Sequence, residues 1–331
     1  MRIRASFLAT CLLATAASAC SGGRDALTIY SGRDEALVAP MLEDFAEETG
    51  IDIDVKYGDS GDLALLIAEE GDNSPADVFL SQSPGPADFL REEGRLGEVG
   101  SEALDRVGPE WTGDEGSWVG VTARQRVLVY NTEMVTEADL PGSVFDLTAG
   151  VYEAAVGVAP ANASFQDFVT AMRATEGDAT AREWLEGMAA NRAPAFADNS
   201  SIVAAVGRGE IPMGLVNHYY NFRALEEDPG SPTANYVFPD GDLGSLLIAS
   251  TVSVLETADD AASANEFADF LLSDDAQEYF SEETFEYPLA EGAEPAPELP
   301  PLDEQEGLVV DLSALGDLET TAQMIADSGL L

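Results

Sequence analysis

Apolar residues alternate between two spacings along the start of the chain. Residues 27–30 form a short run of β-forming side chains, and the apolar positions between 37 and 45 then recur at helical spacing. Gly50 closes this predicted helix, and apolar and polar residues alternate across 51–55 as they do in a strand. Strand–helix–strand units of this kind build parallel sheets that are covered by helices.

The same order of short strands and helices continues to the C-terminus. Further strands are predicted at 77–80, 118–122, 127–130, 155–159, 211–216 and 246–255. Helices are predicted at 62–70, 86–93, 165–175, 179–190 and 201–207, twice within 259–280, and at about 314–330, with a proline-rich connector at 291–301. The chain has 331 residues, of which 45% are hydrophobic, so it is long enough for two α/β lobes, and we expect them to be connected more than once.

The N-terminus has the pattern of a secretory signal peptide, which we place at residues 1–19. Arg2 and Arg4 precede an apolar stretch at 7–17, and small residues at 17–19 form a cleavage site. The apolar stretch is too short to span a bilayer.

Cys20 follows this cleavage site and precedes Ser-Gly-Gly, which resembles a bacterial lipoprotein box. We therefore expect Cys20 to carry a lipid, residues 20–26 to form a tether, and the protein to be anchored to the membrane on its extracytoplasmic side. Cleavage after Ala19 and release of a soluble protein is the alternative. Cys11 leaves with the signal peptide, so the processed chain keeps one cysteine and cannot form an internal disulfide.

The chain is strongly acidic, with 62 Asp and Glu residues against 15 Lys and Arg and a net charge of -47. The acidic residues are spread along the whole chain, and Lys56 is the only lysine. This pattern indicates a solvated acidic surface suited to high salt, where screening relieves the self-repulsion, or alternatively a field that attracts cations. A surface of this sign excludes nucleic acid as a partner.

Residues 216–222, VNHYYNF, place two adjacent tyrosines and the only histidine at a junction between predicted elements. In the first turn of a helix, neighbouring side chains lie about 100° apart, so two phenol rings can converge on one point, whereas on a strand they would face opposite sides. A helix N-terminus also favours negative charge on a phenolate. Taken alone, the pair is better explained by packing, with one ring in the core and the other on the surface of a lobe.

Several short motifs occur in one order along the chain: IYSGRDE, GDNSPADVFL, VTARQRVLVYN, VAPANASFQDFV, ADNSSIVAAVGRGEIPMGLVNHYY and EYPL. Together they resemble the ferric-iron-binding lipoproteins that serve as solute-binding proteins of ABC importers, and the similarity covers nearly the whole processed chain. The resemblance implies a two-lobed periplasmic-binding-protein (Venus flytrap) fold with a hinge of crossing strands. It also implies a monomer that carries iron in the cleft between its lobes and delivers it to a membrane permease with a cytoplasmic ATPase.

On this fold, the N-terminal lobe would comprise residues 27–131 and about 245–285, and the C-terminal lobe residues 132–244 and about 286–331. The chain would cross between the lobes near Tyr130–Asn131 and again between Asp240 and Leu246.

The tyrosine pair suits Fe(III) because this hard cation prefers hard, negatively charged oxygen donors. The unperturbed pKa of tyrosine is about 10, so only a strong cation makes the phenolate favourable at neutral pH, and binding would release protons. In the context of the family, we predict that Tyr219 and Tyr220 carry the iron. His218 occupies a position that is not a regular ligand in the family, and we expect it to lie beside the site.

The rest of the iron site departs from one pattern of the family. Other members use a His, or a His-Tyr pair, after the first strand and sometimes a Glu after the PADVF strand, but here these positions are Asp34, Glu35 and Gln82. The chain is closer to members with YSGR, which implies Tyr30 as a third phenolate together with a carbonate-like anion. Packing of Tyr30 at the strand end is the alternative, and Asp34 or Glu35 would then offer a carboxylate, with Gln82 adjacent to the site.

A synergistic anion such as carbonate needs hydrogen-bond donors. The guanidinium groups of Arg33 and Arg124 suit a carboxylate or carbonate, although each arginine could instead form a surface ion pair. A helix N-terminus near residue 165 offers backbone N–H groups, and ordinary capping there is compatible with anion binding. The resemblance assigns the anion to this loop, which is Asn162, Ala163 and Ser164 here. It also assigns the anion to two asparagines, at the positions of Asn199 and Asn217.

Other functions on the same fold stay open at this point. A polar organic anion or a phosphonate is the alternative ligand, since one fold serves many ligands, but the tyrosine pair argues against it. An enzyme is not expected, because the sequence has no nucleophile elbow, HExxH, P-loop or CxxC pair. A sensor or adhesin that keeps the fold without transport is a third possibility.

Overall fold

The computed structural model describes residues 26–239, 241–302, 308–309 and 318–331. The predicted signal peptide, the predicted lipidation site Cys20 and Asp240 lie outside the described residues. Within these described ranges, no helix is both long and apolar enough to cross a membrane.

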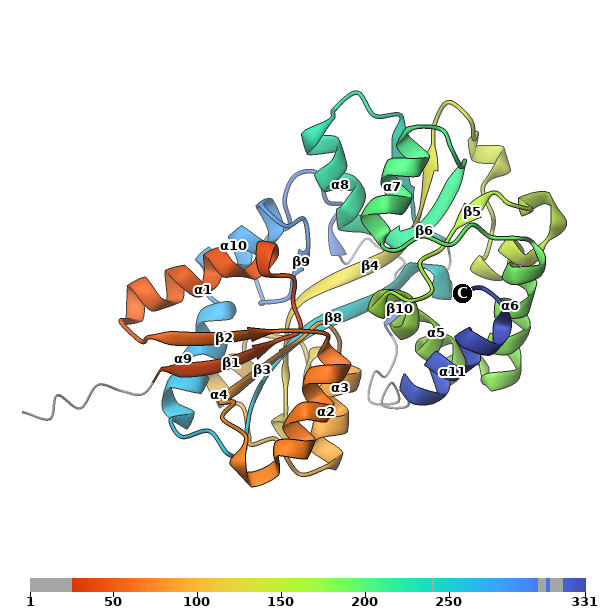
Figure 1. The fold of residues 1–331 in the computed structure, drawn as a ribbon. Coiled ribbons are helices and arrows are strands. Elements are labelled where there is room, and N and C mark those ends of the chain that lie inside the picture. The colour runs from red at the N-terminus through yellow and green to blue at the C-terminus, as the bar shows by residue number, and fades with distance from the viewer. Residues whose placement is uncertain (1–25, 240, 303–307, 310–317) are drawn as a thin grey trace, which may run out of the picture.

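Two α/β lobes, joined by two long strands, make up the molecule (Figure 1), and the predicted fold class is confirmed. In the first lobe, parallel pairing joins β1 (Leu27–Ser31) to both β2 (Ile53–Tyr57) and β3 (Val78–Ser81). Its helices are α1 (Glu35–Thr49), α2 (Ser60–Glu70), α3 (Pro84–Glu92), α4 (Ser101–Leu104), α9 (Ala261–Leu271) and α10 (Asp274–Glu282).

The strands of the first lobe separate two apolar cores. Ile29 of β1 packs with Phe45 of α1 in one core, whereas Tyr30 packs with Leu63 and Phe79 in another. Neighbouring residues of a strand point to opposite faces of the sheet, so Ile29 and Tyr30 are separated in this way.

In the second lobe, β5 (Val156–Gly157) pairs with β6 (Met213–Asn217), and β6 and β7 (Thr233–Tyr236) each pair with the end of a long strand that is described below. The helices of this lobe are α5 (Ala163–Glu176), α6 (Asp178–Ala190), α7 (Asn199–Gly207), α8 (His218–Glu227) and α11 (Leu318–Ser328). The helices α5 and α6 pack through Phe168 and Trp184, whose ring centroids lie 5.5 Å apart. This lobe therefore has an apolar core of its own.

The two long strands are β4 (Val119–Asn131) and β8 (Leu246–Val254), and Figure 1 shows β4 passing between the lobes. The part of β4 up to Gln125 pairs antiparallel with β8, and from Arg126 onward it pairs with β6. We predicted two separate strands and a crossing near Tyr130–Asn131. One continuous strand is present instead, and its pairing changes lobe at Gln125–Arg126.

The chain also stays longer in the first lobe than the predicted boundary near residue 286. The short strand β9 (Tyr287–Pro288) pairs with β4, and Leu289 and Leu299 pack in the first-lobe core. The side chain of Gln277 accepts the backbone N–H of Leu289, which holds this segment against α10. The chain therefore returns to the second lobe only after Leu299, near β10 (Leu308–Val309), which pairs with β8.

Candidate functional site

A cavity of about 410 Å³ lies between the lobes and brings together many of the predicted site residues. Its walls come from the loop after β1, the N-termini of α2, α5 and α7, and the first turn of α8. The residues that line it are Arg33, Asp34, Leu37, Asp59 and Gln82 of the first lobe, and Ala161, Asn162, Ala163, Ala197, Asp198, Ser200, Tyr219 and Tyr220 of the second.

Tyr219 and Tyr220 lie in the first turn of α8, directly after β6 ends at Asn217. Their rings are stacked, with centroids 4.2 Å apart and an interplanar angle of 28°. Tyr219 is 5% exposed, and Tyr220 is half-buried. The two rings therefore converge at the cavity, as helical spacing predicts.

The surroundings of Tyr219 disfavour a phenolate as long as no cation is bound. Burial holds the pKa of Tyr219 well above its ordinary value, and Tyr220 and Glu286 raise it further, while the positive charge of Arg124 opposes them. Only a strong positive charge in the cavity would make deprotonation favourable.

Two arginines project from the same face of β4 at the crossing, because they are two residues apart on a strand. Arg124 is 2% exposed and Arg126 is 1% exposed. Within the described part of the chain, no guanidinium nitrogen of Arg124 has a hydrogen-bond partner, and Nε and Nη2 of Arg126 have none either. Burial lowers the pKa of Arg126 to about 10, and the charge of Arg124 adds to this effect. Buried guanidinium groups without partners favour the binding of an anion.

Arg33 differs from this pair because it already has a carboxylate partner. Its Nη2 donates to Oε2 of Glu286 at 2.6 Å, and both side chains are buried. Thr122 Oγ1 donates to the same oxygen at 3.0 Å. Although burial opposes it, the charges of Arg33 and Arg124 hold the pKa of Glu286 below its ordinary value. Neither Arg33 nor Arg124 forms the surface ion pair that we considered as an alternative.

The predicted anion loop forms a hydrogen-bond network at the N-termini of α5 and α7. Oδ1 of Asn162 accepts from the backbone N–H of Ser164 at 3.1 Å and from Nδ2 of Asn199 at 3.1 Å. Nη1 of Arg126 donates to Oγ of Ser164 at 3.3 Å and to Oδ1 of Asn217 at 3.0 Å. Asn162 therefore caps α5 and, with its neighbours, connects this helix end to β4 and to the start of α8.

The structure does not bring Tyr30 to the cavity. Its hydroxyl donates to Oε1 of Glu70 at 3.1 Å on the other face of the sheet, and burial and Glu70 raise the pKa of Tyr30 to about 12. Tyr30 packs in an apolar core near the end of β1, which is the alternative that we considered to iron ligation. Glu35 is exposed at the start of α1 and does not line the cavity either.

Asp34 and Gln82 do line the cavity. Oδ1 of Asp34 accepts the backbone N–H of Ala36 at 3.0 Å, so this carboxylate also caps α1. Nε2 of Gln82 donates to the carbonyl of Gly32 at 2.7 Å.

His218 lies beside the tyrosine pair but is part of the packing between the lobes. Its Nδ1 accepts the backbone N–H of Gln125 at 3.1 Å, and its ring stacks on Tyr287 at 4.8 Å. Burial lowers the pKa of His218 to about 4, so the ring is neutral at physiological pH.

Sequence reasoning missed three buried charged residues in and around the site: Arg126, Asp167 and Glu286. The Arg-x-Arg spacing on a strand could have indicated Arg126, and the EYPL motif contains Glu286. Asp167 accepts a 3.1 Å hydrogen bond from Ser83 across the lobes, and burial raises its pKa to about 6. No sequence signal distinguishes it among 62 acidic residues.

No group of three or more His, Cys, Asp or Glu side chains in the described ranges is arranged to hold a metal ion. A metal in this cavity would therefore need the phenol oxygens and a bound anion in addition to a single carboxylate such as that of Asp34.

Comparison with known proteins places the chain among transport proteins. Residues 73–310 match the family of bacterial extracellular solute-binding proteins. A Fe(3+)-binding periplasmic protein of Serratia marcescens is 30% identical over 324 residues, 97% of this chain and 95% of that protein. Iron uptake protein A1 of Synechocystis sp. is 30% identical over 281 residues, 82% of this chain and 78% of that protein.

Among solved structures, that of iron-bound HitA from Pseudomonas aeruginosa aligns with a TM-score of 0.87 and 32% identity. The alignment covers 92% of this chain and 99% of HitA. The resemblance indicated by the sequence motifs is thereby confirmed, and the chain belongs to the family of bacterial extracellular solute-binding proteins, alongside proteins that bind ferric iron.

Proposed function

We propose that this protein binds Fe(III) between its lobes through the phenolates of Tyr219 and Tyr220. The observation that carries the proposal is the stacked tyrosine pair at a helix N-terminus, open to the interlobe cavity. The charge of Fe(III) would reverse the effect of burial on the Tyr219 pKa, and binding would release the phenol protons. The iron-binding relatives support this cargo over a phosphonate or another polar organic anion.

The remaining coordination positions would be filled by a small anion and by the first lobe. Carbonate, or another oxygen anion, would be held by the guanidinium of Arg124, which has no hydrogen-bond partner in the part of the chain that the structure describes, and by the network around Asn162. Asp34 and Asp59 are the carboxylates that line the cavity from the first lobe. We propose Asp34 as the ligand, because it follows the strand β1 directly, and it would take the place that we had considered for Tyr30.

Delivery would follow the scheme of the family. The protein would act outside the cytoplasmic membrane as a monomer, anchored through a lipid on Cys20, and would pass its iron to an ABC permease with its ATPase. Loading would close the lobes about β4 and β8. The relatives are binding proteins, and we propose no catalytic activity.

The test is the visible spectrum of the protein from residue 24 onward, purified in high salt, stripped of metal and mixed with ferric citrate. We expect a phenolate-to-iron charge-transfer band that weakens in both Tyr219→Phe and Tyr220→Phe. Tyr30→Phe is the matched control, since this phenol faces Glu70, and it should keep the band. A colourless wild type whose melting temperature ignores iron would refute the proposal and turn the search to organic anions.

A further inference from the structure

A buried carboxylate lies beside the two buried arginines of β4. Asp167 belongs to α5 and is 4% exposed. Nη1 of Arg126 donates to Ser164, one turn earlier on α5, and the guanidinium carbon of Arg126 lies 5.6 Å from the centroid of the Phe168 ring. Residues three and four apart share one face of a helix. The face of α5 that meets Arg126 therefore also carries Asp167.

Hydrogen bonds satisfy only one oxygen of this carboxylate. Oδ1 of Asp167 accepts from Oγ of Ser83 at 3.1 Å, a bond that joins the two lobes. Oδ2 is buried and has no hydrogen-bond partner among the residues that the structure describes. Burial raises the pKa of Asp167 to about 6, although the charges of the two arginines and the bond from Ser83 oppose this effect. Asp167 can therefore change its charge near neutral pH.

Other titratable groups of this junction keep their charge between about pH 6 and pH 8. Burial lowers the pKa of Arg126 to about 10 and that of His218 to about 4, so the guanidinium stays charged and the imidazole stays neutral. Although burial opposes them, neighbouring arginines hold the pKa of Glu286 below its ordinary value, and this carboxylate is ionised. Burial holds the pKa of Tyr219 well above its ordinary value, and this phenol is neutral. A change of charge in this range is therefore expected from Asp167.

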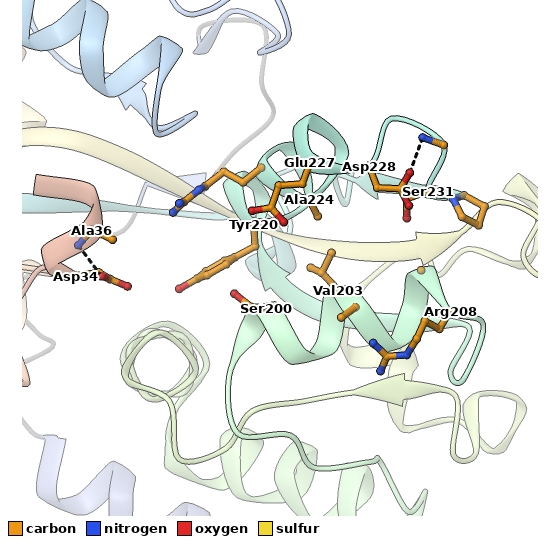
Figure 2. Close-up of a pocket in the computed structure, with 15 residues that line it drawn as sticks. Asp34, Ala36, Ser200, Val203, Arg208, Tyr220, Ala224, Glu227, Asp228 and Ser231 are labelled. Carbon is orange, nitrogen blue, oxygen red and sulfur yellow. Dashed lines mark hydrogen bonds between the residues drawn. The ribbon is translucent and has the colours of Figure 1, made fainter. Parts of the chain in front are cut away.

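The carboxylates that the first lobe places around the interlobe cavity are exposed, unlike that of Asp167. Asp34 lines this cavity and also a second one, of about 630 Å³, between the start of α1 and the helices α7 and α8. Figure 2 shows the carboxylate of Asp34 directed toward the hydroxyl of Tyr220 across this space. Asp59 is exposed at the start of α2, and its charge raises the pKa of Asp167 further. Water screens charges at exposed groups, so an anion bound at the arginines would act most strongly on Asp167.

We infer that Asp167 couples the binding of an anion at Arg124 and Arg126 to the uptake of one proton. The inference rests on the anion site of the proposed function. Without an anion, the two guanidinium charges stabilise the carboxylate. A bound anion would oppose them beside a group that water screens little, so the pKa of Asp167 would rise and the carboxylate would take a proton from the solvent. That proton would be placed on Oδ2, because Oδ1 already accepts from Ser83.

This coupling would change the proton balance of loading. Phenols release their protons when they bind a metal, whereas Asp167 would take one up with the anion. Loading with Fe(III) and an anion would then release one proton fewer than the phenols give up. Acidification would weaken iron ligation by the phenolates while it strengthens the binding of the anion.

The test uses inorganic sulfate and the metal-free protein, so its result does not depend on iron. Sulfate holds no proton between about pH 6 and pH 8, whereas carbonate and phosphate themselves titrate in or near this range. Isothermal titration calorimetry near about pH 7, at constant ionic strength and in two buffers with different ionisation enthalpies, gives the number of protons taken up per sulfate. The same titrations near about pH 6 and pH 8 give the pH dependence of the affinity.

The variants are Asp167→Asn and, as the matched control, Asp88→Asn. Asparagine at position 167 keeps an oxygen that can accept from Ser83 but holds no charge. Asp88 is 1% exposed, burial raises its pKa, and its Oδ2 also lacks a hydrogen-bond partner within the described ranges. Its Oδ1 accepts from Trp118 and Arg91 in the first lobe, away from the arginine pair.

We expect the wild type and Asp88→Asn to take up protons with sulfate, and to bind it about five- to twentyfold more tightly at pH 6 than at pH 8. Asp167→Asn should bind sulfate without proton uptake and with nearly the same affinity at both pH values. A wild type that binds no sulfate, or binds it without proton uptake, would overturn the inference, and so would uptake that persists in Asp167→Asn. The wild-type band with ferric citrate separately decides whether the proposed function stands.

Discussion

At the scale of single residues, the partners of the buried arginines separate structural from ligand-binding roles. Arg33 is neutralised by Glu286, whereas Arg124 has no hydrogen-bond partner among the described residues. A buried ion pair is costly to break from one side, because it leaves a charge without a partner. A buried charge that has no partner already bears that cost, and an anion would relieve it.

Substitution of Arg33 should therefore lower the stability of the protein, whereas substitution of Arg124 should lower its affinity for iron. In Arg33→Gln, Glu286 is left buried without its ion-pair partner, so we expect a loss of about 3–5 kcal/mol in the free energy of unfolding. In Arg124→Gln, we expect that free energy to stay within about 1 kcal/mol of the wild type, while iron binds at least about tenfold more weakly. Urea unfolding of the metal-free proteins and iron titration measure the two effects. Equal stability losses would contradict the assignment.

The placement of individual site residues could be predicted only where local geometry determines it. The convergence of Tyr219 and Tyr220 follows from their position at a strand-to-helix junction, which the apolar pattern shows. The side chain of Tyr30 points away from the cavity because the sheet packs that face of β1 against a separate apolar core. The packing of both faces of the sheet decides this, and the sequence near Tyr30 does not show it. Asp167 is placed by contact between the lobes, so its neighbours in the sequence carry no sign of its role.

At the scale of elements, close contact between β6 and α7 positions the start of α8. Gly214 of β6 lies against Ile202 of α7, and a Cβ at Gly214 would be 2.1 Å from Cγ2 of Ile202. The strand then leads directly to Asn217 and the tyrosine pair. The close approach of β6 to α7 at this glycine therefore fixes the strand from which the tyrosine pair begins.

Gly214→Ala should destabilise the protein by about 1–3 kcal/mol, because the added methyl group overpacks the contact with Ile202. Gly150→Ala is the matched control, since no atom lies within 4 Å of its added Cβ and its φ is not positive. Urea unfolding midpoints check the difference. If both variants unfold at the same urea concentration, the close packing of β6 on α7 is not important for stability.

Most elements were predictable, and the main error concerns β4. The polar run Arg124–Gln125–Arg126 interrupts the apolar pattern, so the sequence predicted a break between two strands. The structure buries these side chains at the junction of the lobes, where Arg126 donates to Ser164 and Asn217. A periodicity argument assumes that buried positions are apolar, and it fails where a binding site is buried.

At the scale of the whole molecule, the surface charge is the dominant feature. Basic residues are too few to neutralise the acidic ones, and several ion pairs, such as Arg192–Glu153, are exposed and contribute little to stability. The folded chain therefore holds many like charges at close range, and their repulsion opposes compactness.

Salt should stabilise the metal-free protein. The Debye length falls from about 10 Å at 0.1 M salt to about 3 Å at 1 M, so repulsion between surface carboxylates weakens over this range. We expect the melting temperature to rise with NaCl and to level off near about 1 M, where screening is nearly complete. Stabilisation by salting-out would instead keep raising the melting temperature above about 1 M. A melting temperature that is constant or falls with NaCl would show that the acidic surface does not limit stability.

The continuity of β4 bears on how the molecule unfolds. Val119 and Val121 belong to the apolar core of the first lobe, and Leu128 to that of the second. Disruption of either core would release a strand that the other core requires. Two lobes that shared only a flexible linker could melt one after the other, but these two are coupled through one strand and should melt as a single cooperative unit.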